Sequence, residues 1–203
     1  SKAGASRATF PCAASLRRAR ATCNLPSMEQ RCTRIVHKAL AVVRPLFRLH
    51  FEGGIHGLPH WSRVWFHGRE LAASLDVDPA VLAWFAYLHD SQRANDGRDP
   101  GHGARAADFA VRLRLARVID ELDDRGFERL CEAMRLHSDG HTTGDVTVLA
   151  CWDADRLDLA RVGIDPHPSR LCTGSARRPE TIRSAVRLAT GVGRRQPAGE
   201  FGQ

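Results

Sequence analysis

The chain has 203 residues, of which 43% are hydrophobic, so it is long and apolar enough for one domain with its own core. No segment approaches the roughly 18 consecutive apolar residues of a transmembrane helix, which argues against a membrane protein. The net charge of +7 comes from the first 50 residues, with 10 basic residues against one acid, so the remainder is nearly neutral and we expect no nucleic-acid surface on the core domain.

Residues 1–27 form a basic leader that is rich in Ala, Arg and Ser and contains no acid. This composition is typical of an organelle transit peptide. It also fits upstream sequence translated ahead of a start at Met28, the interpretation that we favour, because helical patterning begins only after Met28. We expect a disordered leader over 1–27, a helical domain over 28–190 and a flexible tail over 191–203.

The cysteines are scattered and form no Cys-x-x-Cys motif, and two of them fall within helical patterns, as small core residues do. This spacing argues against a zinc ribbon or a secreted disulfide framework and indicates a reducing, cytoplasmic compartment. The six are Cys12, Cys23, Cys32, Cys131, Cys151 and Cys172.

The first helix is expected over 29–49, bent or broken near Pro45. A glycine-bearing loop over 53–59 follows, and His60 opens the next helix. His60 shares one face with Val64, His67 and Leu71. A histidine on such a face is more often a core or capping residue than a metal ligand.

The stretch Val81–Asp90 is an apolar run that ends in a histidine next to an aspartate. Asp78 and Pro79 are typical of N-cap and N1 positions, and an apolar surface on all sides predicts a buried helix. His89 and Asp90 are then carried into the interior, where a carboxylate needs a hydrogen bond, an ion pair or a cation. A structural hydrogen bond between the two is the simplest alternative.

A polar loop follows over residues 91–102, with two acids, two arginines and a histidine. Such a loop next to buried ligands is typical of the rim of a site for an anionic substrate. An ordinary solvated connection is the alternative, and it is the interpretation that we favour for Arg98 and Asp99.

Further helices are expected over 103–118, over 124–137, after the cap Asp145 and over 179–189, with a turn over 137–141. Asp155 falls on the apolar stripe of the helix after Asp145, so its carboxylate needs a metal or a buried arginine as partner. Asp153 and Asp158 lie off that stripe. We expect them either to support the ligands from behind or to be exposed to solvent. The chain is therefore predicted to be an all-α, single-domain protein.

Three predicted helices thus each direct nitrogen or oxygen donors inward: His60, His89 with Asp90, and Asp155. Two imidazoles and two carboxylates suit a divalent ion such as Mn, Fe, Co, Ni or Mg, with room for water. A water on such a cation loses a proton near neutral pH, and the cation can also hold a phosphoryl oxygen.

His60 followed by Val64, Leu88-His89-Asp90 and Ala154-Asp155-Arg156-Leu157 together resemble the HD superfamily of metal-dependent phosphohydrolases. The resemblance covers roughly residues 50–165. It implies an all-helical fold with His60, His89, Asp90 and Asp155 as metal ligands.

The chain also departs from that family. Many members have Lys or Glu three residues after the aspartate, where this chain has Arg93, which could bind a phosphate oxygen. Binuclear members add histidines after the His-Asp pair. His102, His137 and His141 are candidates for a second metal or for substrate binding, so one ion is expected and a second stays open.

The leading hypothesis is therefore a hydrolase of a small phosphorylated molecule, a nucleotide above all, acting through a metal-activated water. Asp90, Arg93 and Asp96 are its predicted catalytic residues, with Asp96 or His137 in proton transfer. The alternatives are a binuclear iron oxygenase on the same scaffold and a metal-stabilised binding module without turnover. The oligomeric state, including a homodimer, is left open.

Overall fold

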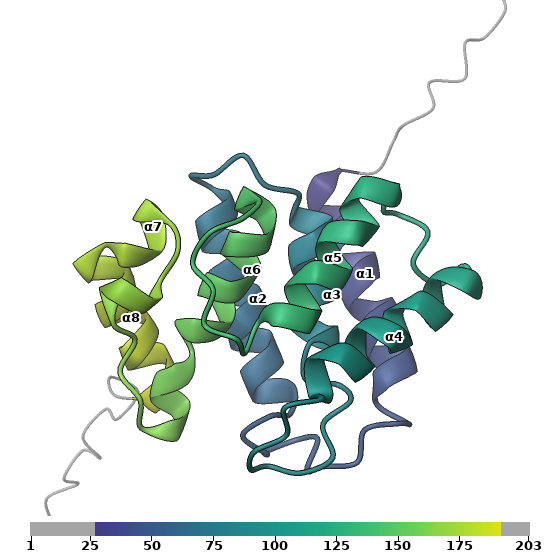
Figure 1. Cartoon of the computed structure of the whole chain (residues 1–203), viewed down its shortest axis with the longest axis horizontal. Helices are drawn as coiled ribbons and strands as arrows, with labels where there is room; N and C mark the ends of the chain where they lie inside the picture. Colours follow the sequence, from purple (N-terminus) through teal and green to yellow (C-terminus); the bar gives the residue numbers. More distant parts are fainter. Residues whose placement is uncertain (1–26, 192–203) are drawn as a thin grey trace, which may run out of the picture.

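Helix α3 (Pro79–Leu88) lies at the centre of the fold, and all of its residues from Ala80 to Leu88 are buried. The side chain of Asp78 accepts a hydrogen bond from the backbone N–H of Ala80, and Pro79 occupies the first turn, as predicted. Around α3 pack helices α1 (Met28–Val43), α2 (Leu58–Ala72), α5 (Asp124–Leu136) and α6 (Val146–Arg156) (Figure 1). The His89-Asp90 pair therefore emerges in the middle of the domain.

The computed structural model describes residues 27–191, and over this range the chain is an all-α domain without a strand. The predicted fold class is thus confirmed. Helix α4 (His102–Leu115) packs on α5, while the 3-10 helices η1 (Leu159–Val162) and η2 (Pro168–Arg170) and helices α7 (Gly174–Arg177) and α8 (Pro179–Thr190) form the opposite end (Figure 1). The basic leader up to residue 26 and the tail from residue 192 lie outside the described residues.

Helix α1 is shorter than the predicted segment 29–49. Ser27 and Gln30 form a capping box at its start, and it ends at Val43, two residues before Pro45. Proline lacks the backbone N–H that a continuing helix needs, so the residues after Pro45 form a loop instead of a second helical segment.

Helix α6 begins as predicted, since the side chain of Asp145 accepts a hydrogen bond from the backbone N–H of Thr147. It ends at Arg156. The chain continues in η1, which has about three residues per turn, and this change of period alters the direction of every side chain beyond Leu157.

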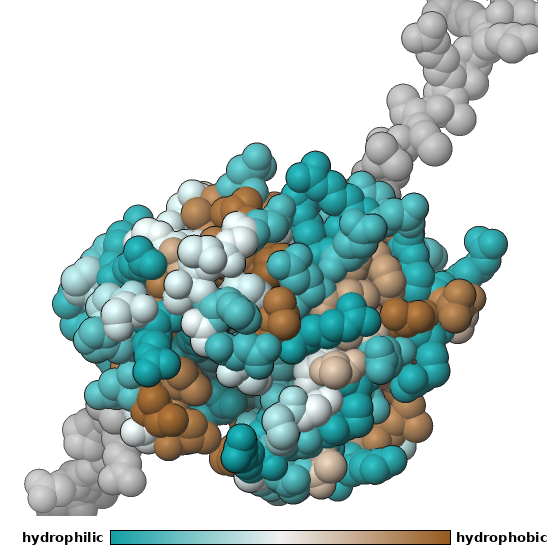
Figure 2. Space-filling view, viewed as in Figure 1, coloured by the Kyte–Doolittle hydropathy of each residue, from teal (hydrophilic) through white to brown (hydrophobic). Residues whose placement is uncertain are grey.

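The surface in Figure 2 is mostly hydrophilic, with apolar residues in separate patches. None of the described helices combines the length and the apolar character needed to cross a membrane. Cys131 and Cys151 are buried in the core as predicted, and within residues 27–191 the cysteines form no disulfide.

Candidate metal centre

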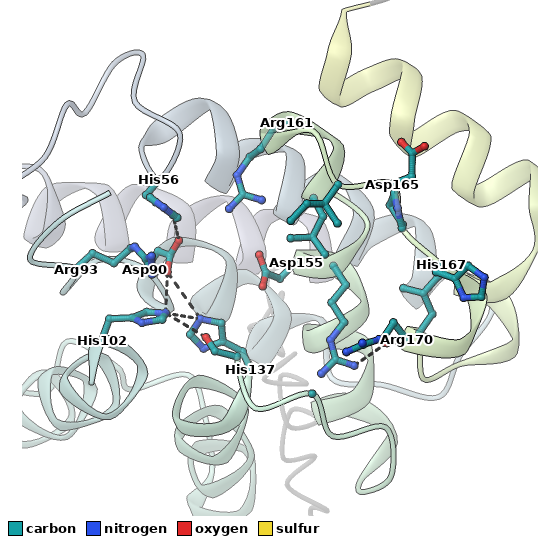
Figure 3. A pocket seen from close by; sticks show the side chains of 17 residues that line it. His56, Asp90, Arg93, His102, His137, Asp155, Arg161, Asp165, His167 and Arg170 are labelled. Atoms are coloured by element: carbon teal, nitrogen blue, oxygen red, sulfur yellow. Dashed lines mark hydrogen bonds and ion pairs between the residues drawn. The ribbon is translucent and has the colours of Figure 1, made fainter. Parts of the chain in front are cut away.

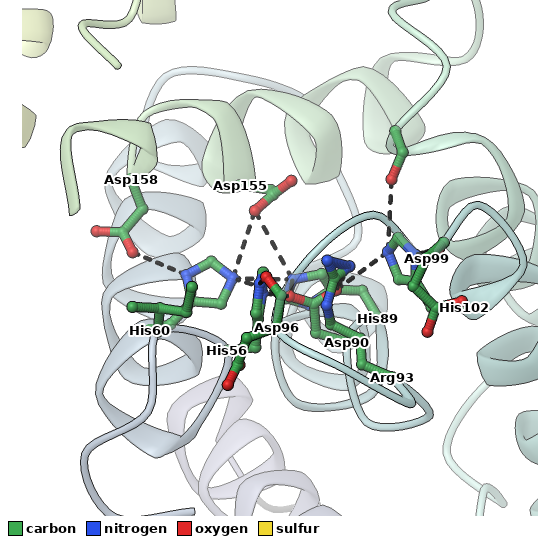
Figure 4. A network of polar contacts seen from close by, with 12 residues as sticks. His56, His60, His89, Asp90, Arg93, Asp96, Asp99, His102, Asp155 and Asp158 are labelled. Atoms are coloured by element: carbon green, nitrogen blue, oxygen red, sulfur yellow. Dashed lines mark hydrogen bonds and ion pairs between the residues drawn. The ribbon is translucent and has the colours of Figure 1, made fainter. Parts of the chain in front are cut away.

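Two groups of three side chains meet at the C-terminal end of α3 (Figure 4). Within each group, one donor atom from each residue lies within 4.8 Å of the others, so each group could hold a metal ion. We call them triad A (His60, His89 and Asp155) and triad B (Asp90, His102 and His137).

The carboxylate of Asp90 lies between the two triads. Its Oδ2 atom is 3.6 Å from Nε2 of His60 and 3.7 Å from Nε2 of His89. Its Oδ1 atom is 3.1 Å from Nε2 of His102 and 3.7 Å from Nε2 of His137. One oxygen thus faces each triad, an arrangement suited to a carboxylate that bridges two cations.

The histidines and Asp155 all lie near helix ends, and this explains how residues far apart in sequence meet. His60 is in the first turn of α2, and Asp155 is in the last turn of α6. His89 and His137 are the C-cap residues of α3 and α5, and His102 is the first residue of α4. Five helix ends therefore converge on one point.

Gly103 allows α4 to approach the end of α5 closely enough to form triad B. A Cβ atom at this position would collide with the backbone carbonyl oxygen of Met134 and would lie 3.3 Å from Cε1 of His137. Backbone cannot move aside as a flexible side chain can, so any larger residue would separate His102 from His137.

Hydrogen bonds fix which nitrogen of each triad A imidazole carries the proton. Nδ1 of His60 lies 2.7 Å from a carboxylate oxygen of Asp158, and Nδ1 of His89 lies 3.1 Å from the carbonyl oxygen of Phe85. Both partners accept, so each Nδ1–H donates and each neutral ring has its lone pair on Nε2. The two Nε2 atoms nevertheless lie only 3.1 Å apart.

Triad B repeats this pattern. Nδ1 of His137 donates to the carbonyl oxygen of Met134 at 2.7 Å, and Nδ1 of His102 donates to the carbonyl oxygen of Asp99. The Nε2 atoms of His102 and His137 are 2.7 Å apart. Two facing lone pairs repel each other unless a proton or a cation lies between them, so both triads have the donor arrangement of a metal site.

Burial lowers the pKa of His60 well below its ordinary value and that of His89 to about 4. Both rings are therefore neutral at pH 7 and can bind a cation without first losing a proton. Burial would raise the pKa of Asp90 and Asp155, but the surrounding imidazoles outweigh it and lower both pKa values. Both carboxylates are thus ionised.

His137 differs from the triad A histidines. Its burial opposes a charged ring, but the carboxylates of Asp90 and Asp155 outweigh burial and raise the pKa of His137 above its ordinary value. The carboxylates of Asp90 and Asp155 thus favour a positive charge at His137, in triad B.

The spacing of the donors also fits a metal. Bonds of about 2.1 Å at angles of about 90–110° place neighbouring donor atoms about 3.0–3.4 Å apart. In triad A, Oδ1 of Asp155 is 3.4 Å from Nε2 of His60, within this range, and 3.7 Å from Nε2 of His89, slightly beyond it. Mixed imidazole and carboxylate donors suit divalent Mn, Fe, Co, Ni or Zn better than Ca.

Two further residues support the ligands: His56, which was not predicted, and Asp158, for which a place behind the ligands was one of the two expected alternatives. His56 lies in the loop before α2, where its Nδ1–H donates to Oδ2 of Asp90 at 2.7 Å. Asp158 is fully buried and accepts hydrogen bonds from His60 and, at 2.6 Å, from Nε of Arg63, so it orients His60 from behind.

Asp153 was expected behind the ligands or in solvent, and neither position is correct. It is fully buried, and its carboxylate accepts hydrogen bonds from the backbone N–H groups of Cys172 and Thr173 and from the Thr173 hydroxyl. Asp153 therefore anchors the segment that leads into α7. The solvent alternative is also wrong for Asp158, which is equally buried.

The other predicted site residues are Arg93, Asp96 and His141, and only Arg93 is buried beside the metal centre. Arg93 is buried, and its Nη1 lies 3.6 Å from Oδ1 of Asp90. Asp96 is exposed, and only its backbone carbonyl approaches His56, at 3.3 Å, so the structure gives its predicted proton transfer no support. His141 is exposed, belongs to neither triad and lies near the ring of Trp152.

A cavity of about 570 Å³ opens beside the metal centre (Figure 3). All of triad B lines it, whereas triad A contributes only Asp155. Arg161, from η1, lines the cavity as well. Its Nε donates to the carbonyl oxygen of Ile55 at 2.8 Å and its Nη1 to that of Asp158 at 3.2 Å. A small molecule in this cavity would therefore contact triad B, Asp155 and two fixed arginines, Arg93 and Arg161.

Comparison of the chain with family models, with curated proteins and with solved structures finds no match.

Proposed function

We propose that this chain is a metal-dependent phosphohydrolase of the HD type that acts on a small phosphorylated molecule, a nucleotide being the leading candidate. The observation that carries the proposal is Asp90, one of whose oxygens faces the buried histidines of triad A and the other those of triad B, beside a cavity. The order His60, His89-Asp90, Asp155 along the chain matches the motifs of that superfamily.

The ligands of the first ion would be His60, His89, Asp155 and one oxygen of Asp90, and those of the second would be His102, His137 and the other oxygen of Asp90. Ions held there supply Lewis-acid polarisation of a phosphoryl oxygen and a lower pKa for a bound water. All of triad B and, from triad A, Asp155 line the cavity in which the substrate would bind.

The protein itself supplies charge and orientation. Arg93 is fixed by its hydrogen bond to the carbonyl oxygen of Gly97 at 3.0 Å, and Arg161 is fixed by Ile55 and Asp158. Both guanidinium groups line the cavity and can donate to phosphoryl oxygens, which gain charge as the ester bond breaks. Because both side chains are already ordered, little entropy is lost on binding.

The test is phosphate release from a panel of phosphate esters and nucleotides by the full chain supplied with Mn²⁺ or Co²⁺. Asp90→Asn should reduce the rate at least about 100-fold, because even residues that merely support metal ligands contribute about 10–100-fold. The matched control is Asp165→Asn, which changes an exposed carboxylate of the same cavity outside both triads and should keep the activity. Equal activity of Asp90→Asn and the parent protein would refute the proposal.

A binuclear iron oxygenase is a second candidate, because the paired triads with a shared carboxylate also suit two irons. That protein would consume oxygen when loaded with Fe²⁺ and release no phosphate. If neither reaction occurs and chelation still lowers the melting temperature, the centre stabilises a binding module instead.

A further inference from the structure

The cavity extends beyond the metal centre to a second wall made by the end of α6 and by η2. Figure 3 shows Arg170 and His167 on the side of the cavity opposite His56, Arg93 and His102. Arg156 also lines the cavity. We call Arg156, Arg170 and His167 the distal wall.

Arg156 is a buried cation without an ion pair. Its side chain is 7% exposed, and its Nη1 donates to the carbonyl oxygen of Arg170 at 2.9 Å and lies 3.2 Å from Sγ of Cys172. Its Nη2 is buried and has no hydrogen-bond partner.

The arginines near the metal centre are different. Arg93 and Arg161 each lie within 4 Å of a carboxylate, at 3.6 Å from Asp90 and 3.8 Å from Asp158. Among the described residues, neither Arg156 nor Arg170 forms an ion pair, although the exposed Asp165 lines the same cavity. A buried guanidinium without a counter-charge is costly, so an anion from outside the chain is the natural partner.

We propose that the distal wall is an anion-binding subsite, so that the substrate is a phosphate ester with a second anionic group, a phosphate or a carboxylate. This inference rests on the proposed hydrolase function. The reacting phosphate lies at the metal centre, and Arg156 and Arg170 bind the second group, which a planar guanidinium can contact through two hydrogen bonds. Leu159, Pro166 and Leu171 line the cavity as well and can pack against the apolar part of the molecule.

The experiment compares substrates that differ only in the second group. Adenosine 3′,5′-bisphosphate is paired with adenosine 5′-monophosphate, and 3-phosphoglycerate with glycerol 3-phosphate. For the full chain loaded with Mn²⁺, kcat/KM should be about 10–100-fold higher for the member with two anionic groups in the pair that fits, since one hydrogen bond to a charged group has about that effect. The pair that shows this preference identifies the second group as phosphate or carboxylate.

The variants are Arg156→Met, Arg156→Lys and Arg170→Met, with Arg183→Met on α8 as the control, because Arg183 is exposed and does not line the cavity. Arg156→Met and Arg170→Met should remove the preference and leave the rate on the member with a single anionic group nearly unchanged. Because Arg170 is exposed, Arg170→Met should fold normally even if loss of the buried Arg156 disturbs folding. Arg156→Lys keeps the charge and should retain part of the preference.

The subsite is refuted if the parent protein hydrolyses both members of each pair equally, or if Arg170→Met and Arg156→Lys both keep the full preference. If no ester is hydrolysed, the proposed function fails. The binding of adenosine 3′,5′-bisphosphate then tests the subsite. Adenosine 3′,5′-bisphosphate should raise the melting temperature of the parent protein more than that of Arg170→Met. Equal shifts in the two proteins would refute the subsite by itself.

Discussion

Triad A and triad B contain the same donor types but differ in their access to solvent. The two histidines of triad A are fully buried, and of this triad only Asp155 reaches the cavity. All three residues of triad B line the cavity, and His102 and His137 come from helices that start or end there. Triad A is therefore enclosed by the core and is suited to retain an ion, while triad B is the side that a substrate would meet.

The largest expected effect is the difference between His60→Ala and His137→Ala. His60→Ala should lose the enclosed ion and about 3 kcal/mol of unfolding free energy, the linkage expected from an ion at about 100 times its dissociation constant. His137→Ala should lose phosphate release but keep the ion of triad A and most of its stability. Elemental analysis, urea unfolding and the phosphate assay measure these quantities. Equal losses of metal and stability in both variants would contradict the comparison.

Gly103→Ala affects triad B without changing any ligand. The added Cβ collides with the Met134 carbonyl oxygen, so α4 must move away from α5 and separate His102 from His137. A displacement of about 1 Å can reduce activity about 100-fold, and we expect that loss with triad A still metallated. Gly174→Ala is the control, because a Cβ atom there meets nothing within 4 Å. Full activity of Gly103→Ala would contradict the role of this close approach.

Asp158→Asn and Asp153→Asn test the support of triad A. Both carboxylates are fully buried, but only Asp158 contacts a triad histidine. Asp158→Asn should weaken metal binding about 10–100-fold, the usual effect of losing the partner of a ligand imidazole. Asp153→Asn should destabilise the segment at Cys172 and Thr173 without changing metal affinity. Competition with a chelator of known affinity measures the difference, and equal affinities would contradict it.

A substitution of His67 should have the smallest effect on the metal centre, because His67 belongs to neither triad. It shows how a buried histidine outside the metal centre behaves. It lies on the same buried face of α2 as His60, but its Nε2 has no hydrogen-bond partner, and burial lowers its pKa to about 4. The unfolded chain takes up a proton on this ring below about pH 6.5 and the folded protein does not, so stability falls as the pH decreases towards 4.

His67→Leu should remove this contribution. Between pH 7 and pH 5, the parent protein should lose about 2 kcal/mol more unfolding free energy than the variant. Urea unfolding of both proteins at the two pH values, with a chelator present throughout, measures this difference. Parallel losses in the two proteins would show that His67 does not titrate in this way.

The central helix and the juxtaposition of His60, His89, Asp90 and Asp155 could be predicted, because local signals define them. Asp78-Pro79 marks the start of α3, and regular helical spacing directs His60 and Asp155 inward. These signals are valid wherever the chain has the period of an α-helix, and the structure has α-helices at these positions.

The residues that sequence reasoning missed lie where that period does not apply. His56 is in a loop, so no helical spacing indicates where its side chain lies. Gly57, which follows it, was a sequence signal of closely packed backbone at this point, since a Cβ at Gly57 would collide with the carbonyl oxygens of His50 and Phe51. Arg161 follows the end of α6, where the chain changes to a 3-10 helix and an α-helical wheel misplaces every side chain. For Asp158, in the same segment, the sequence left support of the ligands and exposure to solvent as alternatives, and the structure has the first. The distal wall combines residues of α6 and η2 and had no sequence signal.

The place of Asp155 in the chain also affects biosynthesis. A ribosome delivers His60 and His89 long before Asp155, so triad A is incomplete in a nascent chain until α6 has been translated. We therefore expect triad A to be completed among the last steps of synthesis, and a truncated translation product that stops before α6 to have a complete set of donors for triad B only.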